Sequence, residues 1–310
     1  MTWLVIAVFW LAAVVFVAAC VARIWMYART PVHLRWELYP VPHEEPEKVR
    51  HGGSYFEDVD WWQRPRRKNL AGELAAMVPE ILFLKGLWEF NRGLWLRSFP
   101  FHFGLYLLCG AGGLLLLTAV LSLGWPGFQA GAVGRLFHHV YSIAGAAGLV
   151  LGLVGAVGLL VRRLTDQTLR TYTSGWDLFN LGFFIVTFAM LGVAHLVRGP
   201  GYQGPLALLI GVLSFRSGMG IPPLFAVAFV LLALLIAYVP LTHMSHFIGK
   251  YFTYHAVRWN DEPNLPGGEL ERRIAEALAY RPTWAAAHLK ADGRRTWAEV
   301  ATINPTREEG

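Results

Sequence analysis

The chain has 310 residues, of which 55% are hydrophobic and only 15% are charged, and its mean hydropathy is +0.41. A soluble domain of this length does not need so much apolar surface, so the composition favours an integral membrane protein. The net charge of +6 needs no nucleic-acid partner, because basic residues concentrate in the cytoplasmic loops of membrane proteins. The two cysteines form no Cys-x-x-Cys motif, which argues against an iron–sulfur or zinc–thiolate site within this chain.

A transmembrane helix needs about 20 predominantly apolar residues. Five stretches satisfy this requirement: residues 3–27, 100–124, 137–161, 178–197 and 222–248. We therefore predict an all-α fold, an integral membrane bundle of five transmembrane helices. The glycine-rich stretch 145–158 predicts close helix packing, because small residues let helix backbones approach in lipid.

The orientation follows from the distribution of Lys and Arg between the predicted spans. The 28–99 loop, the 162–177 loop and the C-terminal tail carry most of these residues, whereas the opposite side carries only Arg135, Arg198 and Arg216. Cytoplasmic loops hold the excess of basic residues. The sequence thus predicts a multi-pass protein of the inner (cytoplasmic) membrane, with its N-terminus outside and its C-terminus in the cytoplasm.

The predicted division along the chain has four parts: a first transmembrane helix over 1–27, a cytoplasmic loop over 28–99, a four-helix membrane bundle over 100–248, and a cytoplasmic tail over 249–310 that docks a partner. Within the loop, residues 74–99 mix apolar positions with Trp, Lys and Arg. This pattern predicts an amphipathic helix on the membrane face, with a plain connector as the alternative.

Two shorter elements complete the prediction. The apolar run 206–213 is too short to span a membrane, and we expect it to cap the outer side or to form a re-entrant piece. The tail is expected to hold a short helix near 268–280.

Histidines are the main functional signal. The chain has eleven, and six lie in or at the ends of predicted spans: His102, His138, His139, His195, His243 and His246. Ionisable side chains are costly inside a membrane and usually face the interior of a bundle for a functional reason. The topology places the first and the last two of these histidines in the cytoplasmic half, and the other three in the outer half. Each group draws on two different helices.

Bis-histidine haem ligation needs this arrangement, because the iron takes one neutral imidazole from each face of a flat macrocycle inside an apolar bundle. We predict at least one haem b, and two if each half of the bilayer holds one. The outer haem would use His139 and His195, with His139 chosen over His138 because it lies deeper. The inner haem would use His102 and a histidine at the end of the last span. Residues 100–248 would then be a haem-binding bundle.

Other uses of these residues stay open. A histidine at a helix end can be an ordinary interfacial residue, the alternative that weighs most for His138 and His243, and His138, His243 and Arg198 are also candidates for proton exchange beside a quinone. Glycines of the second span either leave room for a porphyrin or pack tightly: Gly104, Gly110, Gly112 and Gly113. The remaining histidines are expected to be surface residues: His33, His43, His51, His255 and His288.

Two short motifs carry a family resemblance. The stretch PLTHMSHF (240–247) resembles the Pro-Phe-Thr-Arg-Leu-Val-His signature of the gamma subunit of respiratory nitrate reductase. This resemblance puts His246 on that family's haem ligand and His243 on its Arg. FHFG (101–104) is similar to the family's Phe-His element, which makes His102 the partner ligand. The family's five-helix topology is similar too.

The stretches 158–184 and 295–305 resemble a narrower group, the nitrate-reductase-gamma-like cytochromes b of the dissimilatory sulfite-reductase-linked transmembrane complex and related redox complexes. The resemblance implies electron exchange between menaquinone and a cytoplasmic iron–sulfur subunit similar to heterodisulfide reductase, beside other membrane or periplasmic subunits. In nitrate reductase the second haem uses positions that are Gly112 and Ala228 here. The outer haem is therefore inferred from depth alone.

These observations predict an electron-transfer subunit of a quinone oxidoreductase complex rather than an enzyme on its own. The working hypothesis has quinone reacting near the outer haem, with protons exchanged at His138 or Arg198. One alternative is the cytochrome b of a hydrogenase, a formate dehydrogenase or an electron-transfer flavoprotein quinone oxidoreductase. Another is a haem-free membrane anchor or transporter that uses the histidines for metal or protons.

Overall fold

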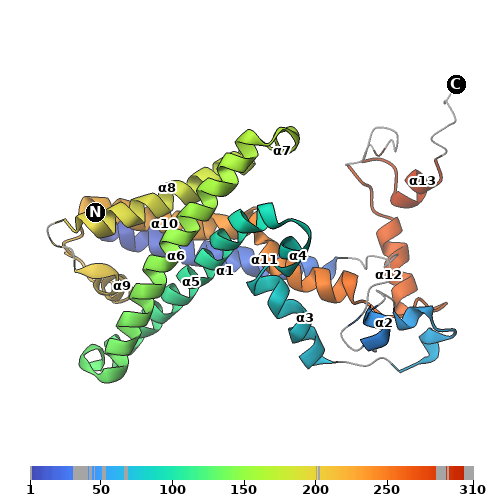
Figure 1. The fold of residues 1–310 in the computed structure, drawn as a ribbon, viewed down its shortest axis with the longest axis horizontal. Helices are drawn as coiled ribbons and strands as arrows, with labels where there is room; N and C mark the ends of the chain where they lie inside the picture. Colours follow the sequence, from blue (N-terminus) through green and yellow to red (C-terminus); the bar gives the residue numbers. More distant parts are fainter. Residues whose placement is uncertain are drawn as a thin grey trace. The chain divides into compact units, whose positions relative to one another are not determined.

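A computed structural model of the chain describes residues 2–30, 41, 44, 46–50, 54–65, 69–199, 201, 203–283, 291 and 293–303. These residues form helices joined by turns, and no strand occurs among them (Figure 1). The all-α prediction is confirmed.

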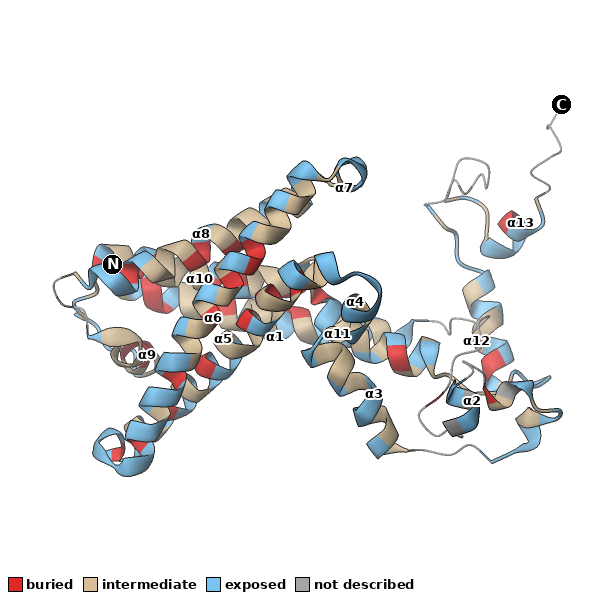
Figure 2. Ribbon diagram, viewed as in Figure 1, coloured by how far each residue is buried: buried red, intermediate tan, exposed pale blue. Residues whose placement is uncertain are grey.

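Five helical stretches are long and apolar enough to cross a membrane: Thr2–Arg29 (α1), Arg92–Gly124 (α5), Ala132–Thr165 (α6), Gly175–Val197 (α8) and Pro223–Leu241 (α10, Pro223–Tyr238, with the turn Val239–Leu241). Much of their surface is exposed or half-buried (Figure 2), and large apolar side chains such as Leu11, Ile143 and Leu196 stand on it. Such a surface suits lipid rather than water. The protein is a multi-pass membrane protein with the five predicted spans.

The helix boundaries near residue 90 differ from the prediction. Residues 74–99 do not form one amphipathic helix but three segments, namely α3 (Leu70–Leu82), α4 (Lys85–Phe90) and the start of α5. Leu84 adopts a left-handed conformation with φ 52°, and the carboxylate of Glu80 accepts the N–H of Gly86 at 2.9 Å. Asn91 caps α5 by accepting the N–H of Leu94 at 3.0 Å. These local caps end one helix and begin the next.

Two compact units divide the chain, and the first contains Met1–Ala19 and Ala75–Met244. In it, α5 packs closely on α6 because glycines meet where the two helices cross. A Cβ added to Gly104 would clash with the backbone of Gly148 and Gly152, and one on Gly155 would clash with the backbone of Phe101. The close packing predicted for 145–158 is confirmed.

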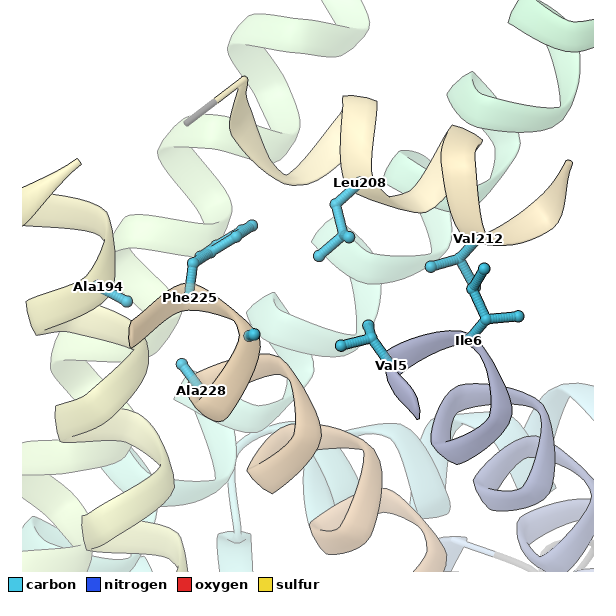
Figure 3. Packing of buried hydrophobic residues seen from close by; sticks show 8 residues of the cluster. Val5, Ile6, Ala194, Leu208, Val212, Phe225 and Ala228 are labelled. Atoms are coloured by element: carbon cyan, nitrogen blue, oxygen red, sulfur yellow. The ribbon is translucent and has the colours of Figure 1, made fainter. Parts of the chain in front are cut away.

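One end of this bundle is closed by α9 (Gly204–Leu213). Figure 3 shows Leu208 and Val212 of α9 beside Val5 and Ile6 of α1, with Phe225 of α10 nearby. The ten residues of α9 are too few to span a membrane, as predicted. Burial of its apolar face against α1 and α10 favours the cap over the re-entrant piece.

The second unit contains Cys20–Leu74 and Ser245–Gly310. It holds helices α2 (Pro46–Arg50), α11 (His246–Phe252), α12 (Glu269–Leu278) and α13 (Trp297–Ala301). The helix expected near 268–280 is α12. His255 is half-buried and its Nδ1 lies 2.9 Å from the carbonyl oxygen of Tyr251. The other expected surface histidines lie outside the described residues: His33, His43, His51 and His288.

Candidate functional site

His102 lies in α5, next to a residue that packs where four helices meet. Its neighbour Phe101 belongs to a buried cluster with Phe184, Phe188 and Leu235, drawn from α5, α8 and α10, to which α6 adds Ala156. The rings of Phe101 and Phe184 lie 5.1 Å apart. His102 itself is half-buried. The sequence predicted this histidine at the start of its span, but α5 begins ten residues earlier, at Arg92, so His102 lies about 15 Å along the helix.

The hydrogen bonds of His102 fix its tautomer. Nδ1 lies 2.8 Å from the carbonyl oxygen of Ser98 and 3.2 Å from its hydroxyl. A carbonyl oxygen only accepts, so Nδ1 carries the proton and donates it. In the neutral form of this imidazole the lone pair is then on Nε2. Histidine ligands of metals commonly donate their other ring N–H in this way.

The last span ends earlier than predicted. It stops at Leu241, not at 248, and Thr242 is extended with ψ −179°. The hydroxyl of Thr242 donates to the carbonyl of Val239 at 3.1 Å and accepts the N–H of Met244 at 3.2 Å. This short turn follows Pro240, which has no N–H to continue a helix. The two histidines of the motif therefore follow the span instead of ending it.

His243 and His246 fall on different sides of the division between the units. His243 opens a short 3₁₀ turn in the first unit, and His246 is the first residue of α11 in the second. The pairing of His102 with His246 stays a prediction.

His243 belongs to a polar cluster at the ends of three helices. Its Nε2 lies 3.8 Å from Oδ1 of Asp177 in α8, and Nη2 of Arg163 in α6 lies 3.7 Å from the same oxygen. Asp177 also accepts the N–H and the hydroxyl of Ser174, which completes a capping box at the start of α8. The sequence analysis missed Asp177 and Arg163, although Ser-x-x-Asp before an apolar run is the signature of a capping box.

At the other ends of these helices the histidines are exposed. Nδ1 of His138 lies 2.7 Å from the hydroxyl of Tyr141, and the rings of His138 and His139 lie 5.8 Å apart. His195 lies in the last turn of α8, where Nε of Arg198 donates to its carbonyl at 3.2 Å. Arg198 ends α8 in a left-handed conformation with φ 41°.

The contacts between α6 and α8 separate His139 from His195. Gly192 lies against Leu149, and Gly152 lies against Phe188, so the two helices run antiparallel. By this register His195 is level with about residue 146, and His139 lies roughly 10 Å further out along α6. In Figure 1 the beginning of α6 and the end of α8 also diverge away from α7 (Gln167–Thr171). The structure does not bring these two histidines together, and their ligation of a haem stays a prediction.

Among the described residues, no three side chains of the His, Cys, Asp and Glu types come together as a metal site. A bis-histidine haem needs only two histidine ligands. The absence of a group of three therefore does not test the predicted haem ligands. Neither the scan of protein-family models nor the search of curated proteins matched this chain.

Proposed function

We propose that the chain is the haem b membrane subunit of a respiratory complex, which transfers electrons between menaquinone and a cytoplasmic iron–sulfur subunit resembling heterodisulfide reductase. The observation that carries the proposal is the environment of His102. Its imidazole donates Nδ1–H to the Ser98 carbonyl within a membrane-spanning helix, and in the neutral form this puts the lone pair on Nε2. A bound haem would supply reversible one-electron transfer.

The residues of this chain fit such a group unequally. His102 has the tautomer and the apolar surroundings that a haem ligand needs. His246 is proposed as its partner because of the resemblance at 240–247. His139 and His195 remain the candidates for a second haem, but their offset along α6 and α8 argues against them. The chain is expected to carry at least one haem.

For proton exchange we favour His243 over His138 and Arg198. Oxidation of a quinol releases two protons with its two electrons, so a nearby group must accept them. Nε2 of His243 lies 3.8 Å from the carboxylate of Asp177, so the ring nitrogen and a carboxylate that could pass a proton on lie side by side. Nη2 of Arg163 lies 3.7 Å from the same carboxylate oxygen. This assignment moves the proposed quinone chemistry to the ends of α6, α8 and α10 that face α7.

The proposal also includes the membrane and the orientation. Basic residues of the 28–99, 162–177 and tail segments would lie in the cytoplasm of the inner membrane. These segments would then face the iron–sulfur partner, and α9 would cover the outer side.

A reduced-minus-oxidised absorption spectrum of the purified chain, with pyridine-haemochrome counting, tests the proposal. We expect a b-type spectrum that is lost in His102→Ala and in His246→Ala but kept in His255→Ala, a matched variant outside the proposed site. A chain that purifies without a Soret band would instead favour a haem-free anchor or transporter. An unchanged spectrum in His102→Ala would refute the ligand assignment.

A further inference from the structure

The second unit contains a pocket that has no part in the proposed electron transfer. Its volume is about 290 Å³, and it is lined by the segments 55–64 and 261–270. Pockets for whole cofactors or drug-sized ligands measure about 300–1,000 Å³. This pocket lies at the lower limit of that range, a size that admits one long side chain.

Aromatic rings form one side of the pocket. The rings of Tyr55 and Trp61 lie 6.0 Å apart at 77°, and those of Trp61 and Trp62 lie 6.3 Å apart at 85°. Rings at right angles turn their faces in different directions. An arrangement of this kind attracts a cation, because the face of each ring is electron-rich.

The charges of the lining have the sign that a cation requires. The lining contains the three acidic residues Asp261, Glu262 and Glu269 against one basic residue, Arg64. Glu269 forms an ion pair with Arg272, so Asp261 and Glu262 supply the negative charge of the lining. The guanidinium of Arg64 itself lies 2.7 Å from the carboxylate of Asp58. The hydroxyl of Tyr55 donates to Oδ2 of Asp261 at 3.0 Å, which joins an aromatic wall to an acidic one. The pocket is thus acidic in a chain whose net charge is +6.

The rim of the pocket is apolar and exposed. Trp62 is 44% exposed and Leu265 is 46% exposed, and both line the pocket. Exposed aromatic and aliphatic side chains around a small pocket are typical of protein interfaces, where an anchor side chain of the partner enters the pocket. A small hydrated cation would not bury this apolar rim.

We infer that this pocket binds an arginine side chain presented by a partner protein. A planar guanidinium stacks on tryptophan faces and forms hydrogen bonds with carboxylates at its edges. Its aliphatic stem and the neighbouring peptide would cover Trp62 and Leu265. The inference does not depend on haem or quinone.

Saturation-transfer NMR on the full chain in deuterated detergent micelles tests the inference. The probe is acetyl-glycyl-arginyl-glycinamide, and its control is the citrulline peptide, which has nearly the same shape but no charge. We expect transfer to the arginine methylene protons and little transfer to citrulline. Glu262→Gln and Trp62→Ala should each weaken binding roughly fivefold. Glu89→Gln, which changes an exposed glutamate of α4 in the first unit, should leave binding unchanged.

Three outcomes would overturn the inference. The citrulline peptide could bind as well as the arginine peptide, or both pocket variants could bind the arginine peptide like the unaltered chain. Tetramethylammonium could also bind more tightly than the peptide, which would make the pocket a site for a small quaternary cation. Circular dichroism of each variant verifies that its helices are intact, and Glu262→Gln keeps the test valid if Trp62→Ala fails to fold.

Discussion

The crossing region around His102 and the end of the bundle around His138, His139 and His195 both hold candidate functional residues, but their packing differs. At the crossing, glycines bring α5 and α6 into backbone contact and phenylalanines fill the space beside them. At the end with His138, His139 and His195 the helices diverge and these histidines are exposed. The depth in the membrane that the sequence predicts does not distinguish the two groups of histidines as haem ligands. Packing distinguishes them, since it decides which histidine is held in one rotamer and one tautomer.

The largest expected effect concerns haem content. If the crossing region holds the haem, His102→Ala removes it, whereas His139→Ala and His195→Ala leave it in place. Pyridine-haemochrome counting should then give about one haem b per unaltered chain. A count of two that falls to one in His139→Ala would mean that α6 and α8 close together around a second haem, and the contrast between the two regions would fail.

Glycine substitutions compare the packing of the two regions directly. Gly104→Leu forces a side chain into the backbone of α6 and should destabilise the bundle by roughly 1–3 kcal/mol. Gly112→Leu is the matched control in the same helix, because nothing lies within 4 Å of its added Cβ. It should change stability by less than about 0.5 kcal/mol. Thermal unfolding in detergent measures both.

Haem content gives the Gly112 variant a second use. A porphyrin packed against this helix would meet the new leucine. A loss of haem in Gly112→Leu with unchanged stability would therefore support the hypothesis that these glycines leave room for a porphyrin. For Gly104, the alternative that the glycine packs tightly between helices is the correct one.

These comparisons show which parts of the structure a sequence can predict. The five spans were predictable because apolar length is a local property of the chain. Their ends were not, since Asn91 and Thr242 set them through single side-chain hydrogen bonds. The histidines were visible as candidates. The offset of His139 from His195 was not, because it follows from contacts such as Gly152 with Phe188 between residues far apart in the sequence.

A third prediction concerns the proton-exchanging pair that we assign to His243 and Asp177. Asp177→Asn keeps an oxygen that can accept the N–H of Ser174, but it removes the charge beside His243 and Arg163. If His243 accepts quinol protons, this variant should slow quinol oxidation roughly 100-fold and change its pH profile. Ser174→Ala keeps the carboxylate and loses only a cap, so its rate should stay near that of the unaltered chain. Equal rates in all three proteins would return the proton site to His138 or Arg198.

The smallest effect comes from a second capping box. Thr296 and Glu299 form this box at the start of α13, where the N–H and the hydroxyl of Thr296 donate to the Glu299 carboxylate. Those hydrogen bonds lower the pKa of Glu299 below its ordinary value. A carboxyl group with a lowered pKa in the folded helix stabilises that helix at pH values above the ordinary pKa. This stabilisation is lost as the pH falls through the lowered value.

Amide exchange in Trp297–Ala301, corrected for its intrinsic pH dependence, should therefore be less protected in acid than at neutral pH. Glu299→Gln should show almost no such change, and a pH response that persists in this variant would show that another group controls α13. Because Glu299 is fully exposed, this effect is small.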